Sequence, residues 1–587
     1  MTPRKLEALR ELLRERKLDG YIVPSADQHS SEYPPAAWRR REWITRFTGS
    51  AGDAVVTLTD ALLWTDSRYF LQAAAQLEGS GFRLMRMGVP GQPTLTEWVG
   101  SNLPEGASFG YDPRLLAHER AGELDRELRS RGVSLKAVEE NLVDLLRTDL
   151  PALPGGPVER WEDSYAGESV PSKVERVREK MRECRVDAHV LARLDDIAWL
   201  FNIRGSDVPY NPLVIAFALV TRNEALLFVQ PGRLRPGVLD ASVEERSYDS
   251  FGEELKARAR QGARFWVDPA ASSRWIVDLS GGEQRCYLST GPVPLFKAVK
   301  NATEIEGMRR AHLRDGVALV RFLVWLEEAA RSRASSELDV AKALERYRAL
   351  GERYRGPSFE PIVGYREHGA IVHYAATPES AVVLAPEGLV LVDSGGHYLD
   401  GTTDVTRTIA LGRPTDEQRA RFTLVLKGHV ALARACFPRG TSGTQLDVLA
   451  RKALWDAGLN YGHGTGHGVG AYLSVHEGPH SISPSSRAVP LEPGMVVSNE
   501  PGYYEVGSYG IRTENLVYVA EDERHEGFLR FVNLTLCPID RSLIDVGLLD
   551  SAERRYLDSY HAEVREALSP SLGERERSRL ERATAPL

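Results

Sequence analysis

The sequence predicts a multidomain protein of α/β and α+β architecture, in which two related α/β domains precede a larger C-terminal domain. The first observation is length, because 587 residues are too many for one hydrophobic core and predict roughly two to four domains. The second is a weak internal repeat in the first half of the chain. The third is a late cluster of histidines and carboxylates, which points to chemistry in the last domain.

The internal repeat relates residues 6–23 to residues 174–191. Each copy predicts an amphipathic helix, a short charged turn and an apolar strand, in that order. Each copy also leads to a phrase typical of a strand, WITRFTGSAG at 43–52 and AWLFNIRGSD at 198–207. Further strands are expected at the runs VVTLT, LLWT and ALLFVQ. The repeat therefore predicts two α/β domains of one kind.

Two segments predict domain boundaries. The stretch TDLPALPGGPVER (148–160) is rich in Pro and Gly, as linkers are. A second boundary is expected near residues 291–307, where Thr303 and Glu306 predict a capping box that opens a long amphipathic helix. The predicted domains are residues 1–153, 154–298 and 299–587.

The composition excludes several classes of protein. The net charge is −8 and the 74 basic residues are spread along the chain, which argues against a nucleic-acid partner. No segment approaches the ~20 apolar residues of a membrane span, and residues 1–17 form a charged helix rather than a signal peptide. The cysteines are too far apart to indicate a disulfide framework. We expect a cytoplasmic protein that binds neither nucleic acid nor membrane.

Two aspartates in residues 389–411 are the first candidate ligands. Apolar runs on either side of Gly-rich turns predict paired strands, with Asp393 at the end of one and Asp404 at the start of the next. Taken alone, both could be ordinary turn aspartates. Their spacing also resembles a calcium loop, but Tyr398 stands where such a loop needs glycine, and the flanking segments are strands.

The segment YGHGTGHGVGAYLSVHEGPH (461–480) supplies imidazoles. His463 and His467 have the i, i+4 spacing of a zincin helix, but the four glycines within 462–468 disfavour a helix and Thr465 replaces the zincin glutamate. We expect the imidazoles to project from a strand or loop that packs closely against its neighbours. A surface His-Gly loop is the alternative.

Two glutamates complete the set. Glu500 follows an apolar strand and Glu514 lies in a second strand-like run, where a solvent-facing glutamate is the alternative. Four carboxylates and one imidazole within residues 393–514 suit a pair of hard or borderline divalent cations, and Mn²⁺ suits them better than a thiolate-preferring metal. Two such ions about 3.5–4 Å apart can bridge a hydroxide and clamp a tetrahedral intermediate. The residues alone thus predict a two-metal hydrolase.

This ligand set resembles that of the pita-bread metallopeptidases, which include methionine aminopeptidase, prolidase and Xaa-Pro aminopeptidase. The phrases HGTGHGVG, VHEGP, EPGYY, DGTTDVTRT and KNATEIEGMRRAH are similar to those of Xaa-Pro aminopeptidase (aminopeptidase P) in its long three-domain cytosolic form. The resemblance implies two creatinase-like N-terminal domains and a pita-bread catalytic domain. It also implies a homodimer that removes the N-terminal residue from peptides with proline in second position.

The resemblance also implies roles for the ligands. It places Asp393 on one metal ion, His467 and Glu500 on the other, and Asp404 and Glu514 as bridges. The ions implied are Mn²⁺, with Zn²⁺ or Co²⁺ as alternatives. Glu500 is the implied proton shuttle, because the proline nitrogen must be protonated before it leaves.

Further residues come from the same resemblance. His373, His463 and His476 match histidines around the substrate, where imidazole donors would stabilise the oxyanion. Arg512 would orient bridging carboxylates. Candidates for a proline pocket and for meeting a peptide carboxylate, each weighed against a packing or solvated role, are Tyr374, Tyr503, Tyr504 and the arginines Arg39, Arg40 and Arg41.

Three alternatives stay open at this stage. A prolidase would accept only Xaa-Pro dipeptides and typically has a shorter, two-domain chain. A methionine aminopeptidase would not explain the first half of the chain. A non-catalytic binding module with the pita-bread fold should lack one or more of the five ligands, and this chain lacks none.

Overall fold

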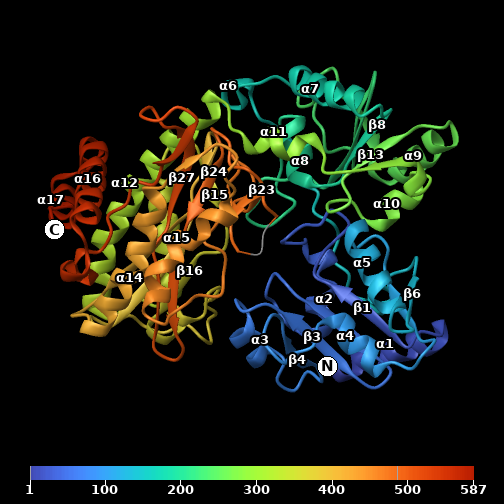
Figure 1. The fold of residues 1–587 in the computed structure, drawn as a ribbon, viewed down its shortest axis with the longest axis horizontal. Coiled ribbons are helices and arrows are strands. Elements are labelled where there is room, and N and C mark those ends of the chain that lie inside the picture. The colour runs from blue at the N-terminus through green and yellow to red at the C-terminus, as the bar shows by residue number, and fades with distance from the viewer. Residues whose placement is uncertain (1, 485–486) are drawn as a thin grey trace. The chain divides into compact units, whose positions relative to one another are not determined.

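The structure, a computed structural model, describes all residues except 1, 485 and 486. The chain divides into two compact units. Figure 1 colours the first unit from blue to green and the second mainly from yellow-green to red. The first unit comprises Met1–Trp161 and Glu168–Val293, and the second comprises Glu162–Gly167 and Pro294–Leu587. The three predicted domain boundaries stay predictions.

The first half of the first unit is a six-stranded sheet with helices. The strand order is β4-β3-β2-β1-β5-β6. The strands are β1 (Gly20–Pro24), β2 (Asp53–Thr57), β3 (Ala61–Thr65), β4 (Arg83–Arg86), β5 (Ser108–Tyr111) and β6 (Ser134–Ala137). The helices are α1 (Thr2–Arg16), α2 (Arg40–Thr45), α3 (Phe70–Gln76), α4 (Leu95–Asn102) and α5 (His118–Arg129).

The second half of this unit repeats the arrangement. Its sheet has the order β12-β11-β10-β8-β13-β14. The strands are β8 (Ala188–Leu191), β10 (Ala216–Thr221), β11 (Ala225–Val229), β12 (Glu244–Ser247), β13 (Phe265–Val267) and β14 (Cys286–Leu288). The helices are α7 (Val170–Glu183), α8 (Leu194–Leu200), α9 (Phe251–Arg260) and α10 (Arg274–Leu279), and β7 (Glu159–Arg160) pairs with β9 (Ile203–Arg204).

The two halves share pairing directions as well as strand order, which confirms the predicted repeat. In each sheet the first strand pairs antiparallel with the second and parallel with the fifth. The strand expected within 43–52 was wrong, because α2 ends at Thr45 and a loop follows. Within 198–207 only β9 is a strand, because residues 198–200 form the end of helix α8. Their apolar side chains are buried from that helix.

The arginines at 39–41 have partners within the first unit. Arg40 is buried and donates to both carboxylate oxygens of Asp144 at 2.9 and 2.7 Å. Arg41 is also buried and donates to the carbonyl of Gly49. Arg39 donates to the carbonyl of Pro34. Arg40 and Arg41 are therefore buried and not solvated, while their contact with a peptide carboxylate stays a prediction.

The second unit opens on helices. α11 (Pro292–Ala298) spans the junction, α12 (Ala302–Ser332) is the predicted long helix, and α13 (Glu337–Ala349) follows it. The predicted capping box was displaced by two positions: Asn301, not Thr303, caps α12 and accepts from the Glu304 amide at 3.0 Å. Asn301 also donates to the carbonyl of Ala166 at 2.7 Å.

Two sheets form the centre of the second unit. One has the order β16-β17-β20 and the other the order β21-β28-β27-β24-β22-β23. The strands of these sheets are β16 (Ile362–Tyr365), β17 (Leu389–Ser394), β20 (Val405–Ala410), β21 (Cys436–Pro438), β22 (Gly466–Gly468), β23 (Glu477–Ile482), β24 (Val496–Asn499), β27 (Asn515–Glu521) and β28 (Phe528–Asn533). Short strands form two separate sheets, one of β15 (Tyr354–Pro357), β18 (Gly396–Tyr398) and β19 (Gly401–Thr402), the other of β25 (Gly502–Glu505) and β26 (Tyr509–Arg512).

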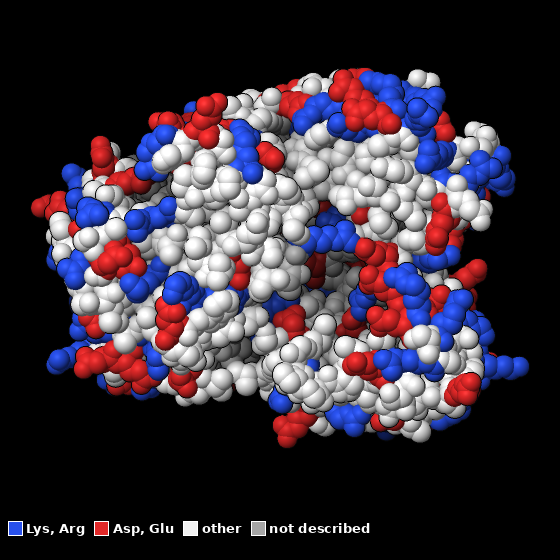
Figure 2. Space-filling view, in the orientation of Figure 1, with Lys and Arg blue, Asp and Glu red and all other residues white. Residues whose placement is uncertain are grey.

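Helices cover these sheets. α14 (Asp416–Ala433) and α15 (Gly443–Asp456) pack on each other, and α16 (Ser551–Leu568) and α17 (Glu574–Ala583) pack on α12 (Figure 1). The small helix α6 (Asp163–Ala166) also belongs to this unit. None of the helices in the described part of the chain is long and apolar enough to cross a membrane. On the face drawn in Figure 2, Lys and Arg alternate with Asp and Glu and do not gather in one basic stripe.

Candidate metal centre

The two predicted aspartates lie on one antiparallel strand pair. β17 and β20 pair so that Asp393 lies opposite Thr406. Asp404 comes directly before β20, which places it two residues from that register point. The predicted pair of strands is therefore confirmed, and it brings two carboxylates that are eleven residues apart in sequence to one end of the sheet. Both aspartates are buried.

The second sheet brings the other three predicted ligands to the same place. His467 lies in β22, which confirms a strand and not a helix for this imidazole. β22 pairs with β24, and β24 pairs with β27 so that Asn499 lies opposite Asn515. Glu500 directly follows Asn499 and Glu514 directly precedes Asn515, so both glutamates lie just beyond the same end of this antiparallel pair. Glu514 lies in the break between β26 and β27, not inside a strand as expected.

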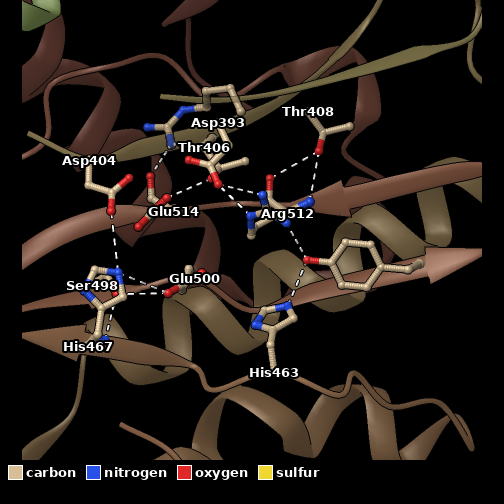
Figure 3. Close-up of polar contacts among 12 residues, drawn as sticks. Asp393, Asp404, Thr406, Thr408, His463, His467, Ser498, Glu500, Arg512 and Glu514 are labelled. Carbon is tan, nitrogen blue, oxygen red and sulfur yellow. Dashed lines mark hydrogen bonds and ion pairs between the residues drawn. The ribbon is translucent and has the colours of Figure 1, made fainter. Parts of the chain in front are cut away.

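The five side chains converge (Figure 3). The Nε2 atom of His467 is 3.5 Å from Asp404 Oδ2 and 3.5 Å from Glu500 Oε1. One ligand atom each from Asp404, His467 and Glu514 lies within 4.8 Å of the others. Ser498 supports the group, since its hydroxyl donates to Glu500 at 3.2 Å.

The electrostatics of this cluster fit divalent cations. Burial raises the pKa of Glu500 to about 7, and burial with neighbouring carboxylates raises the pKa of Asp393 and Glu514. Such crowding of like charges is unfavourable without a counter-charge. Within the described part of the chain, the buried Oδ1 atoms of Asp393 and Asp404 have no hydrogen-bond partner. Buried polar atoms are normally satisfied, so these oxygens are available as metal ligands.

The surroundings of His467 also favour a positive charge. Burial opposes a charged imidazole, but Asp404 and Glu500 raise the pKa of His467 to about 9. Asp404 and Glu500 thus favour a positive charge beside the ring. Since a metal ion needs neutral imidazole, a divalent cation at this point would replace the imidazole proton and supply more charge. The donor set and its electrostatics fit the predicted metal pair.

Arg512 is buried against the same group. Its Nη2 donates to Asp393 Oδ2 at 2.6 Å, and its Nη1 donates to the hydroxyl of Tyr504 at 2.7 Å. Its Nε donates to Thr406 at 3.2 Å, and Thr406 in turn donates to Glu514 Oε2 at 2.8 Å. The guanidinium therefore touches one carboxylate directly and a second through a threonine, a geometry that suits the orienting role predicted for it.

The three predicted histidines differ in their surroundings. The His476 ring lies edge-on to the His467 ring, with centroids 4.4 Å apart. His463 Nε2 is 2.8 Å from the Tyr504 hydroxyl, and its Nδ1 is 2.7 Å from the Gly464 carbonyl. His373 is half-buried and follows the 3₁₀ helix η5 (Arg366–Ala370), which packs against β26. His476 therefore lies beside a predicted ligand, and His463 lies beside Tyr504.

Known sequence families match almost the whole length of the chain. The description "Metallopeptidase family M24" matches residues 306–521, and "C-terminal region of peptidase_M24" matches residues 527–587. Two descriptions of "Creatinase/Prolidase N-terminal domain" match residues 5–148 and 149–304. The N-terminal repeat thus corresponds to two creatinase-type domains.

Individual relatives narrow the family. The "Probable Xaa-Pro aminopeptidase P" of Tuber melanosporum is 42% identical over 96% of this chain and 95% of its own length. That of Aspergillus clavatus is 42% identical over 100% of this chain and 93% of its own. The chain belongs to the Xaa-Pro aminopeptidase P family. A solved structure agrees: the X-prolyl aminopeptidase of Caenorhabditis elegans, described as a cytosolic enzyme with a di-nuclear active site, matches with a TM-score of 0.96, 36% identity and 100% coverage of both chains.

Membership of this family confirms the predicted fold class, two creatinase-like domains followed by a pita-bread metallopeptidase domain. The assignment of each site residue to a role stays a prediction.

The structure separates the three tyrosines that the sequence grouped together. Tyr504 belongs to the site, because its hydroxyl lies between Arg512 and His463. Tyr503 packs in the core and donates to Glu505, while Tyr374 donates to Glu337 at 3.1 Å. Strand periodicity could have separated the first two, because adjacent residues of β25 face opposite sides.

A second set of metal-ligand types lies on the surface of the same unit. Cys436, Asp522 and His525 bring a thiol, a carboxylate and an imidazole within 4.8 Å of one another. Arg524, however, donates to both oxygens of Asp522, at 3.3 and 2.9 Å. A cation would have to displace this guanidinium. In the cluster of five candidate ligands, Asp393 and Asp404 each keep an oxygen without a hydrogen-bond partner among the residues that the structure describes, which favours that cluster as the candidate metal centre.

Proposed function

We propose that this protein is a metal-dependent aminopeptidase that hydrolyses the Xaa-Pro bond and releases the N-terminal residue from peptides with proline in second position. One observation carries the proposal: the five candidate ligands, four carboxylates and one imidazole, converge at one partly buried point, in a chain 36% identical over its full length to an X-prolyl aminopeptidase with a di-nuclear site. A non-catalytic module is disfavoured because no ligand is missing.

The ligands divide between two divalent ions. Asp393 would hold one ion, His467 and Glu500 the other, and Asp404 and Glu514 would bridge them. Oxygen-rich coordination with one imidazole favours Mn²⁺, with Zn²⁺ or Co²⁺ as alternatives. When bound, such a pair supplies a nucleophile at neutral pH and stabilises the negative charge that develops on the scissile carbonyl.

Glu500 carries the proton in this scheme. Its carboxylate takes a proton from the attacking water and returns it to the proline nitrogen, which must be protonated before the bond breaks. Ser498 holds one oxygen of Glu500 through a hydrogen bond of 3.2 Å, so the carboxylate keeps its orientation. Arg512, through Asp393 and Thr406, keeps the facing carboxylates in place.

Histidines would meet the substrate. His476, edge-on to His467, is close enough to the ligands to donate to the developing oxyanion. His463 Nε2 lies 2.8 Å from the Tyr504 hydroxyl, a contact that fixes the plane of the imidazole ring. His373, on the segment after η5, is proposed as a third substrate contact. Each of these roles assumes a peptide bound with its scissile carbonyl at the metal pair.

The remaining properties are proposals of the same kind. The cytosolic description of the Caenorhabditis elegans enzyme supports a cytoplasmic location here. Resemblance to the long three-domain form supports a homodimer, with peptides as its partners and neither nucleic acid nor membrane among them.

Substrate length separates this function from that of a prolidase. Protein loaded with Mn²⁺ is incubated with Ala-Pro-Ala, with Ala-Pro and with Ala-Ala-Ala, and free alanine is measured. We expect release of alanine from Ala-Pro-Ala and little from Ala-Ala-Ala. Activity confined to the dipeptide would make the protein a prolidase. Asp404→Ala serves as the inactive control, since it removes a proposed bridging ligand; unchanged metal content in this variant would contradict the two-metal site.

A further inference from the structure

A buried ion pair on α15 lies directly under the loop that carries His463. Arg451 donates to Asp447 through Nε at 2.6 Å and through Nη2 at 3.2 Å, and each side chain is only 4% exposed. Burying two charges is costly unless geometry and further hydrogen bonds compensate. The remaining donors of Arg451 therefore need partners, and the loop provides them.

Arg451 binds the loop backbone at two places. Its Nη1 donates to the carbonyl of Tyr461 and its Nη2 to the carbonyl of His463, both at 2.8 Å. The guanidinium also lies 4.0 Å from the centre of the Tyr461 ring. Gly462, between the two carbonyls, gives the chain little conformational preference of its own. The arginine therefore fixes the loop on both sides of that glycine.

Asp447 reaches the metal ligands through Thr465. The Thr465 hydroxyl donates to Asp447 Oδ1 at 2.6 Å and lies 2.5 Å from the hydroxyl of Tyr461. The carbonyl of Thr465 accepts from the backbone amide of Glu500 at 2.8 Å. Thr465 is fully buried. Hydrogen bonds of Thr465 thus connect the ion pair to the backbone of Glu500, the proposed metal ligand and proton carrier.

We propose that Arg451 and Asp447 are positioning residues of the peptidase site, acting through the loop 461–465. Arg451 fixes the backbone conformation of the loop from which His463 projects toward Tyr504. Asp447, through Thr465, sets the backbone of Glu500. The inference rests on the proposed function, in which His463 and Glu500 act on the substrate. Without these contacts, the glycine-rich loop would let the side chains of His463 and Glu500 shift by more than catalysis tolerates.

Two substitutions test the loop contacts without removing charge from the pair. Arg451→Lys keeps a cation beside Asp447 but cannot donate to both carbonyls at once. Thr465→Val keeps the volume and removes the hydroxyl, whereas Thr465→Ser keeps the hydroxyl. Steady-state kinetics with Ala-Pro-Ala at saturating Mn²⁺ should show kcat lower by about 10- to 100-fold in Arg451→Lys and Thr465→Val, as for other residues that orient metal ligands. KM should change less than kcat, and Thr465→Ser should restore most of the activity.

A matched control separates positioning from general stability. Arg233 and Asp207 form a comparable buried pair in the first unit, with distances of 2.5 and 2.7 Å. Arg233→Lys and Arg451→Lys should both lower Tm, but Arg233→Lys should leave kcat of the folded, metal-loaded protein unchanged. A purely structural role for Arg451 would give the same pattern in both variants.

The outcomes are distinguishable. Wild-type kcat and KM in folded, metal-saturated Arg451→Lys and Thr465→Val would overturn the inference and leave the proposed function standing. If Arg451→Lys fails to fold, the comparison of Thr465→Val with Thr465→Ser decides, and equal kcat in these two variants overturns it. Failure of the unmodified protein to release alanine from Ala-Pro-Ala would instead refute the proposed function.

Discussion

Arg512 donates to Asp393 at 2.6 Å, and with its other η nitrogen it donates to Tyr504 at 2.7 Å. One guanidinium therefore joins a proposed metal ligand to the hydroxyl that faces His463. The planar fork of arginine makes both bonds at once, which the ammonium of lysine does not. Hydrogen bonds through this residue therefore link a proposed metal ligand to a proposed substrate contact.

The first prediction concerns that connection. Arg512→Lys keeps the charge near Asp393 but loses the second bond, so the carboxylate is held less firmly. Metal affinity should fall by about 10- to 100-fold, as for other partners of metal ligands. Competition with a fluorescent chelator measures this directly. Arg233→Lys is the control, and metal affinity equal in Arg512→Lys and the unmodified protein would contradict the orienting role.

A second prediction tests the proton shuttle. Glu500→Gln has nearly the shape of glutamate but cannot accept the proton, and it is a weaker ligand. kcat should fall by about 10²- to 10⁴-fold, the usual contribution of a general acid–base group, while circular dichroism shows the native fold. Glu505→Gln, five residues along on β25, should behave like the unmodified protein. Normal turnover in Glu500→Gln would refute the role given to Glu500.

Tyr504 gives a third prediction, because its hydroxyl is the partner of His463 Nε2. Tyr504→Phe keeps the ring and removes the hydroxyl. Loss of a hydrogen bond worth roughly 0.5–1.5 kcal/mol should lower kcat/KM by about 2- to 10-fold. Tyr503→Phe removes a hydroxyl that bonds Glu505 on the opposite face of the strand and should leave kcat/KM unchanged. Equal effects of the two substitutions would mean that the Tyr504 contact has no part in catalysis.

Stability should depend on pH through buried histidines, and His561 is the clearest case. Its Nε2 accepts from the Ile539 amide at 3.2 Å, and burial, with Arg407 and Arg541 nearby, lowers the pKa of His561 to about 4. In the unfolded chain the pKa of histidine is about 6.5. As pH falls below that value, the unfolded state binds the proton first and the free energy of unfolding decreases. The contribution of neutral His561 to the stability of the folded state is therefore complete above pH ~6.5. It is lost as pH falls toward ~4, at up to about 1.4 kcal/mol per pH unit.

Urea unfolding at pH 7 and pH 5 measures the effect. His561→Gln keeps an acceptor for the Ile539 amide and does not titrate, so its free energy of unfolding should change less between the two pH values. An identical change in the variant and the unmodified protein would show that His561 does not contribute to the pH dependence.

Local sequence patterns predicted several strands and the positions of three candidate ligands at strand ends, because apolar runs that end at Gly-rich turns define where strands end. Asp393, Asp404 and Glu500 were placed at strand ends on this basis, and the structure puts them there. The repeat likewise predicted two domains whose sheets have the same strand order and pairing directions.

Long-range contacts account for what the sequence did not predict. Asn301 and not Thr303 caps α12, and Asn301 is also bonded to Ala166, 135 positions away. Arg40 is paired with Asp144, 104 positions away, so its neighbours in sequence could not show that it is buried. The support of the His463 loop by Arg451 is of the same kind, because it comes from helix α15 and not from the glycine-rich motif itself.

We propose above all that the five ligands hold two metal ions, which supply the nucleophile for hydrolysis of the Xaa-Pro bond. The most direct test removes all metal with a chelator and titrates the protein with Mn²⁺ while alanine release from Ala-Pro-Ala is followed. Activity should be absent without metal and should rise to a plateau at two equivalents per chain. Full activity in the metal-free protein, or a plateau at one equivalent, would contradict the two-metal account.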